Sequence, residues 1–129
     1  MNEVESKRIL SKLQRKYPKK DGWAIQPREG KDKKKPDYLV ERRNEANALE
    51  RVVVDARPLK RITDKDVARL NTFARNMAGG RSRILGKVFA VPNGANTEIV
   101  PEKISVIFYE PDTPVVEMPR VEAVAVQTV

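Results

Sequence analysis

One short segment constrains the fold of this chain more than any other. It contains the run Val52-Val53-Val54 and continues directly into Asp55-Ala56-Arg57. Consecutive β-branched residues, without alternation of polar and apolar positions, are typical of a strand covered on both faces. We therefore expect this strand, over residues 50–57, to be central in its sheet, with other elements packed on both sides.

A second strand is predicted just before it, over Asp37 to Arg42, after Pro36. The polar segment 44–47, which contains two asparagines, suits a hairpin turn. Two strands joined in this way bring Asp37 and Asp55 to neighbouring positions, with Arg57 two residues beyond Asp55 on the same strand face. Two carboxylates beside a cationic side chain predict a site for a metal ion and a phosphate.

Helices are predicted on either side of these strands. Asn2 and Glu5 form a capping box for a helix ending near Tyr17. Thr63 and the acids that follow it begin a second helix, which Gly79-Gly80 terminates. Further strands are expected over 22–26, 84–91 and 103–109, which gives the order α-β-β-β-α-β-β. The fold class is therefore α/β, with a mixed sheet, flanking helices 3–17 and 63–78, and one obvious parallel crossover.

The 129 residues indicate one domain, over 1–110, followed by an arm over 111–129. The alternating run 121–126 in this arm suits a frayed tail, an edge strand or a segment that pairs with a second protomer in a homodimer. No stretch of roughly 18 to 20 apolar residues is present, and the first residues lack a signal-peptide pattern. We expect a cytoplasmic protein without a membrane partner.

Cysteine and histidine are both absent, which limits the chemistry available to the chain. Disulfides, thiolate nucleophiles, zinc sites of Cys or His, and a histidine acid or base are excluded. Any catalysis must depend on carboxylates, lysine, arginine, hydroxyl groups and a hard cation held by oxygen ligands.

The net charge of +8 is concentrated near the N-terminus. Residues 1–35 hold twelve basic and five acidic side chains, residues 36–110 thirteen and ten, and residues 111–129 one and three. Such an uneven distribution of positive charge favours a polyanionic partner, above all nucleic acid. The lysine-rich segment 31–35 suits either a solvated loop or phosphate contacts. The cations predicted to contact phosphate are those that flank the two strands: Lys31, Lys33, Lys34, Lys35, Lys60 and Arg61.

The order of these features resembles the restriction-endonuclease-like PD-(D/E)XK nuclease superfamily. The shared features are a basic helix with an acid near its start, a Gly-Trp strand, a Pro-Asp step, the Val-Val-Val-Asp-Ala-Arg segment and a helix after it. The resemblance covers roughly residues 3–91, and its motif is short and degenerate. It implies a restriction-endonuclease-like core and hydrolysis of phosphodiester bonds in nucleic acid, DNA rather than RNA, with Mg²⁺ or Mn²⁺.

By position, the resemblance makes Asp37 and Asp55 the metal ligands and places Arg57 where the superfamily has lysine. It also implies catalytic roles for Glu5, or else Glu3, on the first helix and for Gln26 on the first strand. The arginine is a chemical departure because a guanidinium stays protonated and cannot act as a general base. It can still neutralise negative charge on a phosphate, and Lys60 is a candidate for the missing amine.

Each of these residues also has a purely structural explanation. Asp37 suits the start of a strand, Glu5 is explained by helix capping, and the pair Asp55 and Arg57 suits a surface ion pair. A charge beside the valine run is nevertheless costly without a partner or a metal. The sequence thus favours a metal-dependent nuclease. The alternatives are a catalytically inactive nucleic-acid-binding or regulatory module of the same fold, and a small basic RNA-associated protein.

Overall fold

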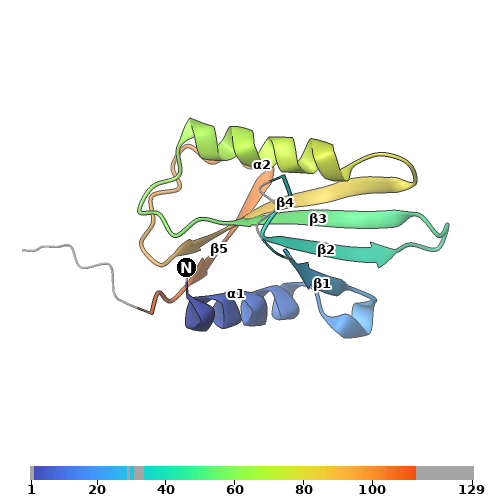
Figure 1. Cartoon of the computed structure of the whole chain (residues 1–129), viewed down its shortest axis with the longest axis horizontal. Helices are drawn as coiled ribbons and strands as arrows, with labels where there is room; N and C mark the ends of the chain where they lie inside the picture. The colour runs from blue at the N-terminus through green and yellow to red at the C-terminus, as the bar shows by residue number, and fades with distance from the viewer. Residues whose placement is uncertain (1, 29, 31–33, 113–129) are drawn as a thin grey trace, which may run out of the picture.

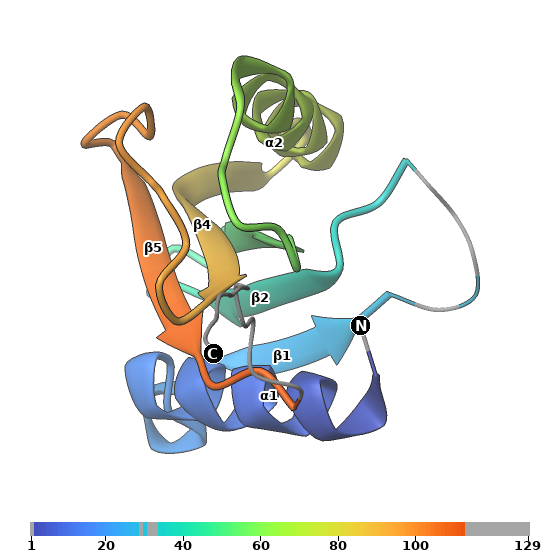
Figure 2. The same cartoon turned by 90° about the vertical axis from the view of Figure 1, so that its left-hand side faces the viewer.

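The chain folds into an α/β domain in which one mixed sheet lies between two helices (Figures 1 and 2). A computed structural model describes residues 2–28, 30 and 34–112. The elements are α1 Glu3–Lys16, the 3-10 turn Lys19–Asp21, β1 Ala24–Pro27, β2 Tyr38–Arg43, β3 Leu49–Ala56, α2 Asp64–Met77, β4 Ser82–Pro92 and β5 Ile104–Tyr109. The predicted order of helices and strands is confirmed.

The five strands lie side by side in the order of the sequence. β1, β2 and β3 form an antiparallel meander, whereas β4 is parallel to β3 and β5 is parallel to β4. The crossover through α2 was predicted, but the second parallel connection was not. Its connecting segment, 93–103, consists of turns and contains no helix, so the sequence pattern gave no sign of a parallel return.

The valine run of β3 explains the three-layer arrangement. Val52 and Val54 face a core beneath α1 that includes Ile9 and Leu13. Val53 faces the opposite core beneath α2, together with Leu70. Because all three valines are at most 2% exposed, both faces of the strand contribute to the hydrophobic interior, as the sequence predicted.

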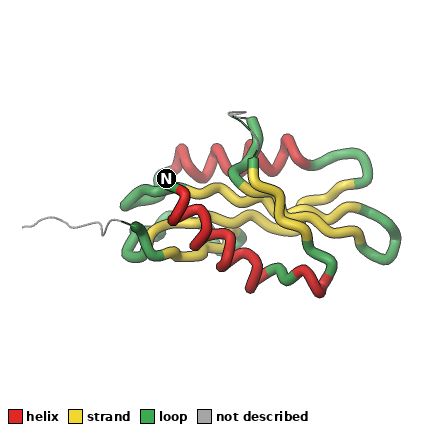
Figure 3. The backbone as a smooth tube through the Cα atoms, turned by 60° about the horizontal axis from the view of Figure 1, so that its bottom comes forward, coloured by secondary structure: helices red, strands yellow, loops and turns green. Residues whose placement is uncertain are grey.

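Both helices begin with a capping box, in which the cap side chain and the third helical residue each accept a backbone hydrogen bond from the other. Asn2 and Glu5 form the box of α1, and Thr63 and Asp66 form that of α2. At each helix start the cap side chain therefore satisfies one of the N–H groups that have no partner within the helix. Figure 3 shows α1 lying across its face of the sheet.

The sequence also led to expectations about the C-terminal arm and about membrane-spanning segments. Of the C-terminal arm 111–129, only residues 111 and 112 are among those described, so the predicted edge strand or homodimer contact lies outside the described residues. No helix within residues 2–28, 30 and 34–112 is both long and apolar enough to cross a bilayer.

The packing of α1 on the sheet predicts a large effect for one core substitution. Leu13 is fully buried, so Leu13→Ala should lower the free energy of unfolding by about 2 to 5 kcal/mol, because it removes buried methyl groups and leaves a cavity. Urea denaturation measures this, with the neighbouring exposed Lys12→Ala as the matched control, expected within about 0.5 kcal/mol of wild type. Equal effects in the two variants would show that α1 does not pack as described.

Candidate functional site

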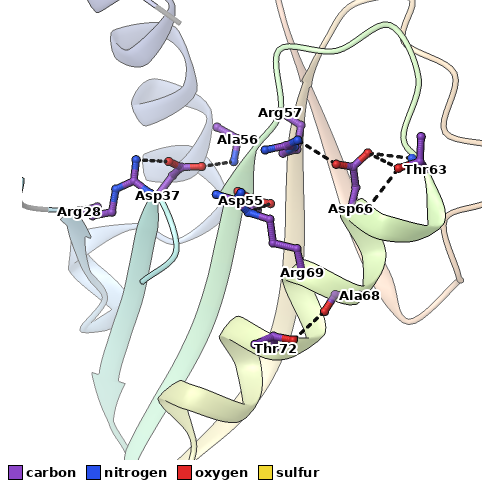
Figure 4. A network of polar contacts seen from close by, with 10 residues as sticks. All are labelled: Arg28, Asp37, Asp55, Ala56, Arg57, Thr63, Asp66, Ala68, Arg69 and Thr72. Atoms are coloured by element: carbon purple, nitrogen blue, oxygen red, sulfur yellow. Dashed lines mark hydrogen bonds and ion pairs between the residues drawn. The ribbon is translucent and has the colours of Figure 1, made fainter. Parts of the chain in front are cut away.

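The β2–β3 hairpin brings Asp37 and Asp55 together. Its register pairs Tyr38 with Val54, so the aspartates that flank this pair lie next to each other at the start of β2 and the end of β3. The Asp37 Oδ2 atom accepts a hydrogen bond of 2.8 Å from the N–H of Ala56, the residue after Asp55. Figure 4 shows the two carboxyl groups on neighbouring strands. The predicted juxtaposition of the two acids is therefore observed.

Asp55 is buried more deeply than the sequence suggested. Its relative exposure is 0%, and neither carboxylate oxygen accepts a hydrogen bond from the described residues. The closest cationic partner is Arg69 of α2, whose Nε lies 3.6 Å from Oδ2. A buried carboxylate with no hydrogen bond is costly, so this group needs a proton, a closer arginine or a cation.

Burial raises the pKa of Asp55 to about 7, because desolvation disfavours the charged form. The neighbouring Asp37 adds to this rise in two ways, since it can accept a hydrogen bond from the protonated Asp55 and its negative charge repels a second one. Arg69 and Arg57 act in the opposite direction and lower the pKa. Near neutral pH Asp55 is therefore partly protonated, and a cation bound beside it would favour its charged form.

Asp37 has an arginine partner of its own. The Nη2 atom of Arg28, directly after β1, lies 3.3 Å from Asp37 Oδ1, and the two side chains are 25% and 18% exposed. The N–H of Arg28 also donates to the carbonyl oxygen of Asp37, at 2.8 Å. Each aspartate of the site is thus paired with an arginine from a different part of the fold. Asp37 pairs with Arg28, which follows β1, and Asp55 pairs with Arg69 of α2.

Arg57 forms its ion pair with Asp66 and not with Asp55, which lies two residues before it in the sequence. Its Nη2 lies 3.0 Å from Asp66 Oδ1, while Asp66 Oδ2 accepts hydrogen bonds from the N–H and hydroxyl of Thr63. The buried Nε of Arg57 has no hydrogen-bond partner among the described residues. Arg57 therefore holds the start of α2 against the end of β3, and one guanidinium N–H is left unsatisfied near the aspartates.

Glu5 and Gln26, the other catalytic candidates, differ in where they lie relative to the aspartate pair. Glu5 belongs to α1, on the opposite face of the sheet from α2 (Figure 2), and its carboxylate accepts backbone hydrogen bonds from Asn2 and Asp112. Gln26 is exposed on β1 opposite Leu39 and lines a surface hollow that Arg28 also lines. Among the described residues no hydrogen bond or ion pair joins either residue to Asp37 or Asp55, although Gln26 lies on the α2 side of the sheet, two residues before Arg28, the partner of Asp37.

The predicted phosphate-contacting cations are divided between two places. Lys31 and Lys33 lie outside the described residues. Lys34 and Lys35 precede β2, and Lys35 lines the same hollow as Gln26. Lys60 and Arg61 are exposed in the β3–α2 connection. The carbonyl oxygen of Lys60 accepts a hydrogen bond from the N–H of Asn96, and Arg61 forms an isolated β-bridge with Asn96. Lys60 has no described contact with the aspartate pair.

Three residues of the site were missed from the sequence. These are Arg28, Arg69 and Asp66, and nothing in the sequence pattern indicated that Arg28 and Arg69 pair with the two aspartates or that Asp66 pairs with Arg57. Arg69 could be recognised only from the crossover, because the return of α2 over β3 sets which helical position faces Asp55. Its guanidinium also lies 5.0 Å from the centre of the Phe73 ring, a cation–π contact that holds it against the helix.

The donor set limits which cations this site suits. Within the described part of the chain, no group of three or more His, Cys, Asp or Glu side chains is placed to hold a metal. Two carboxylates alone suit Mg²⁺ or Mn²⁺, because these hard ions retain several waters and also bind substrate phosphates. The three arginines around the aspartates suit an anion such as a phosphodiester.

Comparisons of the chain with protein-family models, with curated proteins and with solved structures found no match.

The raised pKa of Asp55 predicts a pH-dependent stability. The pKa is about 7 in the folded protein against 3.8 for an ordinary aspartate, so the folded state binds the additional proton between these values and stability should fall as pH rises from about 4 to about 7. The steepest contribution is about 1.4 kcal/mol per pH unit. Asp55→Asn should remove this component. Urea denaturation of both proteins in chelator across this pH range measures it, and parallel pH profiles would contradict the assignment.

Proposed function

We propose that this chain is a metal-dependent nuclease with a restriction-endonuclease-like core, which hydrolyses phosphodiester bonds in nucleic acid, DNA rather than RNA. The observation that carries the proposal is the pair formed by Asp37 and Asp55, in which the buried Asp55 carboxylate has no hydrogen bond from the described residues. Functional sites are where such costly groups are found, because they bind or react with something else.

The architecture supports this assignment. The resemblance noted in the sequence depends on the order of elements, and the helix, antiparallel meander, crossover helix and parallel strand follow in that order. The Pro-Asp step and the Asp-Ala-Arg segment meet at one end of the β2–β3 pair. The likeness in topology is an argument from fold alone, so the chemistry must be argued from the site.

The residues present fit a magnesium or manganese ion. Asp37 and Asp55 would hold it, and the Asp55 oxygens, which accept no hydrogen bond from the described residues and have Arg69 at 3.6 Å as their ion-pair partner, would be its buried ligands. When bound, such an ion lowers the pKa of its water and so supplies the nucleophile. Binding requires Arg28 and Arg69 to release the carboxylates, and both side chains are partly exposed, at 25% and 40%.

The arginines are suited to the phosphate rather than to proton transfer. Guanidinium groups remain protonated and bind phosphate through paired N–H donors. Arg28 and Arg69 can turn to a phosphodiester. The Nε–H of Arg57, which has no hydrogen-bond partner among the described residues, is a further donor beside the site. In this arrangement the arginines orient the phosphate and neutralise charge that develops on it, while Arg57 stays anchored through Asp66.

A second function is favoured by the same arginines. Asp55 is sealed from solvent, each aspartate already has a cationic partner, and Arg57 stands where the superfamily has lysine. These features suit a catalytically inactive module of the nuclease fold that binds nucleic acid or regulates a partner. In such a module the guanidinium groups take the place of the metal, and the acids serve to hold them.

A cleavage assay separates the two functions. With Mg²⁺ or Mn²⁺, the wild-type protein should cleave DNA, offered as plasmid, linear duplex and single strands, and Asp55→Asn should reduce the rate at least roughly 100-fold because it removes a ligand of the ion. The matched control is Asp64→Asn, which removes an exposed acid from the first turn of α2 and should leave the rate near wild type. Binding without metal-dependent cleavage would select the inactive module.

Metal binding can also be measured without substrate. A cation that binds only the folded protein raises its stability, by about 2.7 kcal/mol at a concentration 100 times the dissociation constant. Mn²⁺ should therefore raise the unfolding midpoint of the wild type and not that of Asp55→Asn. An equal rise in both proteins would show that the ion binds elsewhere.

A further inference from the structure

Two surface hollows adjoin each other beside β2. The first has a volume of about 590 Å³ and lies between the end of β1, the segment before β2 and the end of α2, where Gln26, Leu39 and Met77 line it. The second, of about 350 Å³, lies at the opposite end of β2 and is lined by Leu49, Gly79 and Ser82. Arg51 lines both. We call the two together the β2 groove.

The β2 groove exists because α2 is offset from the centre of the sheet. α2 packs on β3 and β4, whereas β1 and β2 have no comparable packing against it. Figure 2 shows α2 above β4, with the segment before β2 rising on the side away from β5. There the carbonyl oxygen of Lys34 accepts a hydrogen bond of 3.5 Å from Nδ2 of Asn76, near the end of α2. The α2-facing side of β1 and β2 is thus left as the floor of an open groove.

The charges around the β2 groove are strongly one-sided. Five of its lining residues are cationic and one, Glu41, is acidic; the cations are Arg28, Lys35, Arg43, Arg51 and Arg81. Glu41 is neutralised locally, because its Oε2 lies 2.6 Å from the Nε of Arg51. Arg51 is fixed in addition by a 2.7 Å hydrogen bond from its Nη1 to the carbonyl oxygen of Met77.

One end of the β2 groove lies beside the aspartate pair, although neither aspartate lines it. Arg28 lines its first hollow and also pairs with Asp37, so a phosphate bound to Arg28 would lie next to the carboxylates. From Asp37 to Arg43 the chain extends by about 20 Å at the usual rise of a strand. The cations along this length, from Arg28 beside Asp37 to Arg43 at the end of β2, therefore cover a span that suits several successive phosphates.

We propose that the β2 groove binds a single strand of nucleic acid, which runs from the aspartate pair along β2 toward Arg81. This inference rests on the proposed function, and it deepens that function by naming the substrate class. A positively charged groove that follows the sugar-phosphate backbone is the usual mode of single-strand binding. The apolar side chains of Leu39 and Met77 offer contact to bases without reading their sequence.

A duplex fits this surface less well. Proteins that read duplex DNA insert a helix or a ribbon into its grooves, whereas here the protein itself provides the concave surface. The cations lie along the lining of the β2 groove, where one backbone can contact them in succession. A single strand, or a single-stranded end of a duplex, therefore makes more of these contacts than a regular helix does.

The experiment measures binding without cleavage. The full chain is titrated in chelator into fluorescent oligonucleotides of about 12 residues, as single-stranded DNA, single-stranded RNA and duplex DNA, at several salt concentrations. The groove variant is Lys35→Glu with Arg81→Glu. The matched control is Lys7→Glu with Lys12→Glu, the same charge change on exposed positions of α1, on the opposite face of the sheet. Thermal unfolding midpoints establish that both variants fold.

The wild type should bind a single strand more tightly than the duplex. The groove variant should weaken single-strand binding roughly tenfold or more and reduce the slope of log K against log salt by about 1.4, for two lost phosphate contacts. The control should stay close to wild type. The DNA and RNA arms establish which strand is preferred.

Three outcomes would each overturn the inference. The protein could bind duplex and single strand with equal affinity, or the groove variant and the control could lose the same amount of single-strand affinity. The groove could also bind an acidic peptide and no oligonucleotide. The result is independent of catalysis. Groove-dependent single-strand binding without metal-dependent cleavage would support the β2 groove and reject the nuclease. Cleavage with no effect of the groove variant on binding would do the reverse.

Discussion

The interior position of the Asp55 carboxyl group is the constraint on which the rest of the site depends. The valine run makes β3 a strand covered on both faces, so a side chain at its end is withdrawn from water unless the sheet opens there. An unpaired charge in that position costs several kcal/mol. Asp55 is accommodated by a raised pKa and by Arg69 at 3.6 Å, and neither device supplies the hydrogen bonds that a carboxylate normally accepts.

The surrounding elements are arranged by ordinary local chemistry. Asp37 hydrogen-bonds to the N–H of Ala56 and so holds the start of β2 against the end of β3. Asp66 serves both as the capping-box acid of α2 and as the partner of Arg57, which links the start of the helix to the same strand end. The cap and the ion pair are interdependent, because a helix beginning elsewhere would not present Asp66 to Arg57.

The sequence predicted most of the fold because its local signals agree with one another. Capping boxes, the β-branched run and the hairpin turn each indicated the element that is observed, and the hairpin placed Asp37 beside Asp55. The arginine partners could not be predicted in this way. Which face Arg69 presents to β3 depends on how α2 returns over the sheet, and the depth of Asp55 depends on packing from elements distant in sequence. The alternative explanation of Asp55 and Arg57 as a surface ion pair is not what the structure shows, because Asp66, held by the helix cap, is the ion-pair partner of Arg57.

The two candidate functions share one step and differ in the next. In both, the phosphates of a nucleic acid compete with Asp37 and Asp55 for Arg28 and Arg69, since a guanidinium pairs with either kind of anion through the same N–H donors. Once an arginine turns to phosphate, a buried carboxylate loses the charge that offset its desolvation. In the nuclease a divalent cation replaces that charge, whereas in an inactive module Asp55 can only take up a proton. The distinction between enzyme and binding module therefore depends on which positive species replaces the arginines beside the two aspartates.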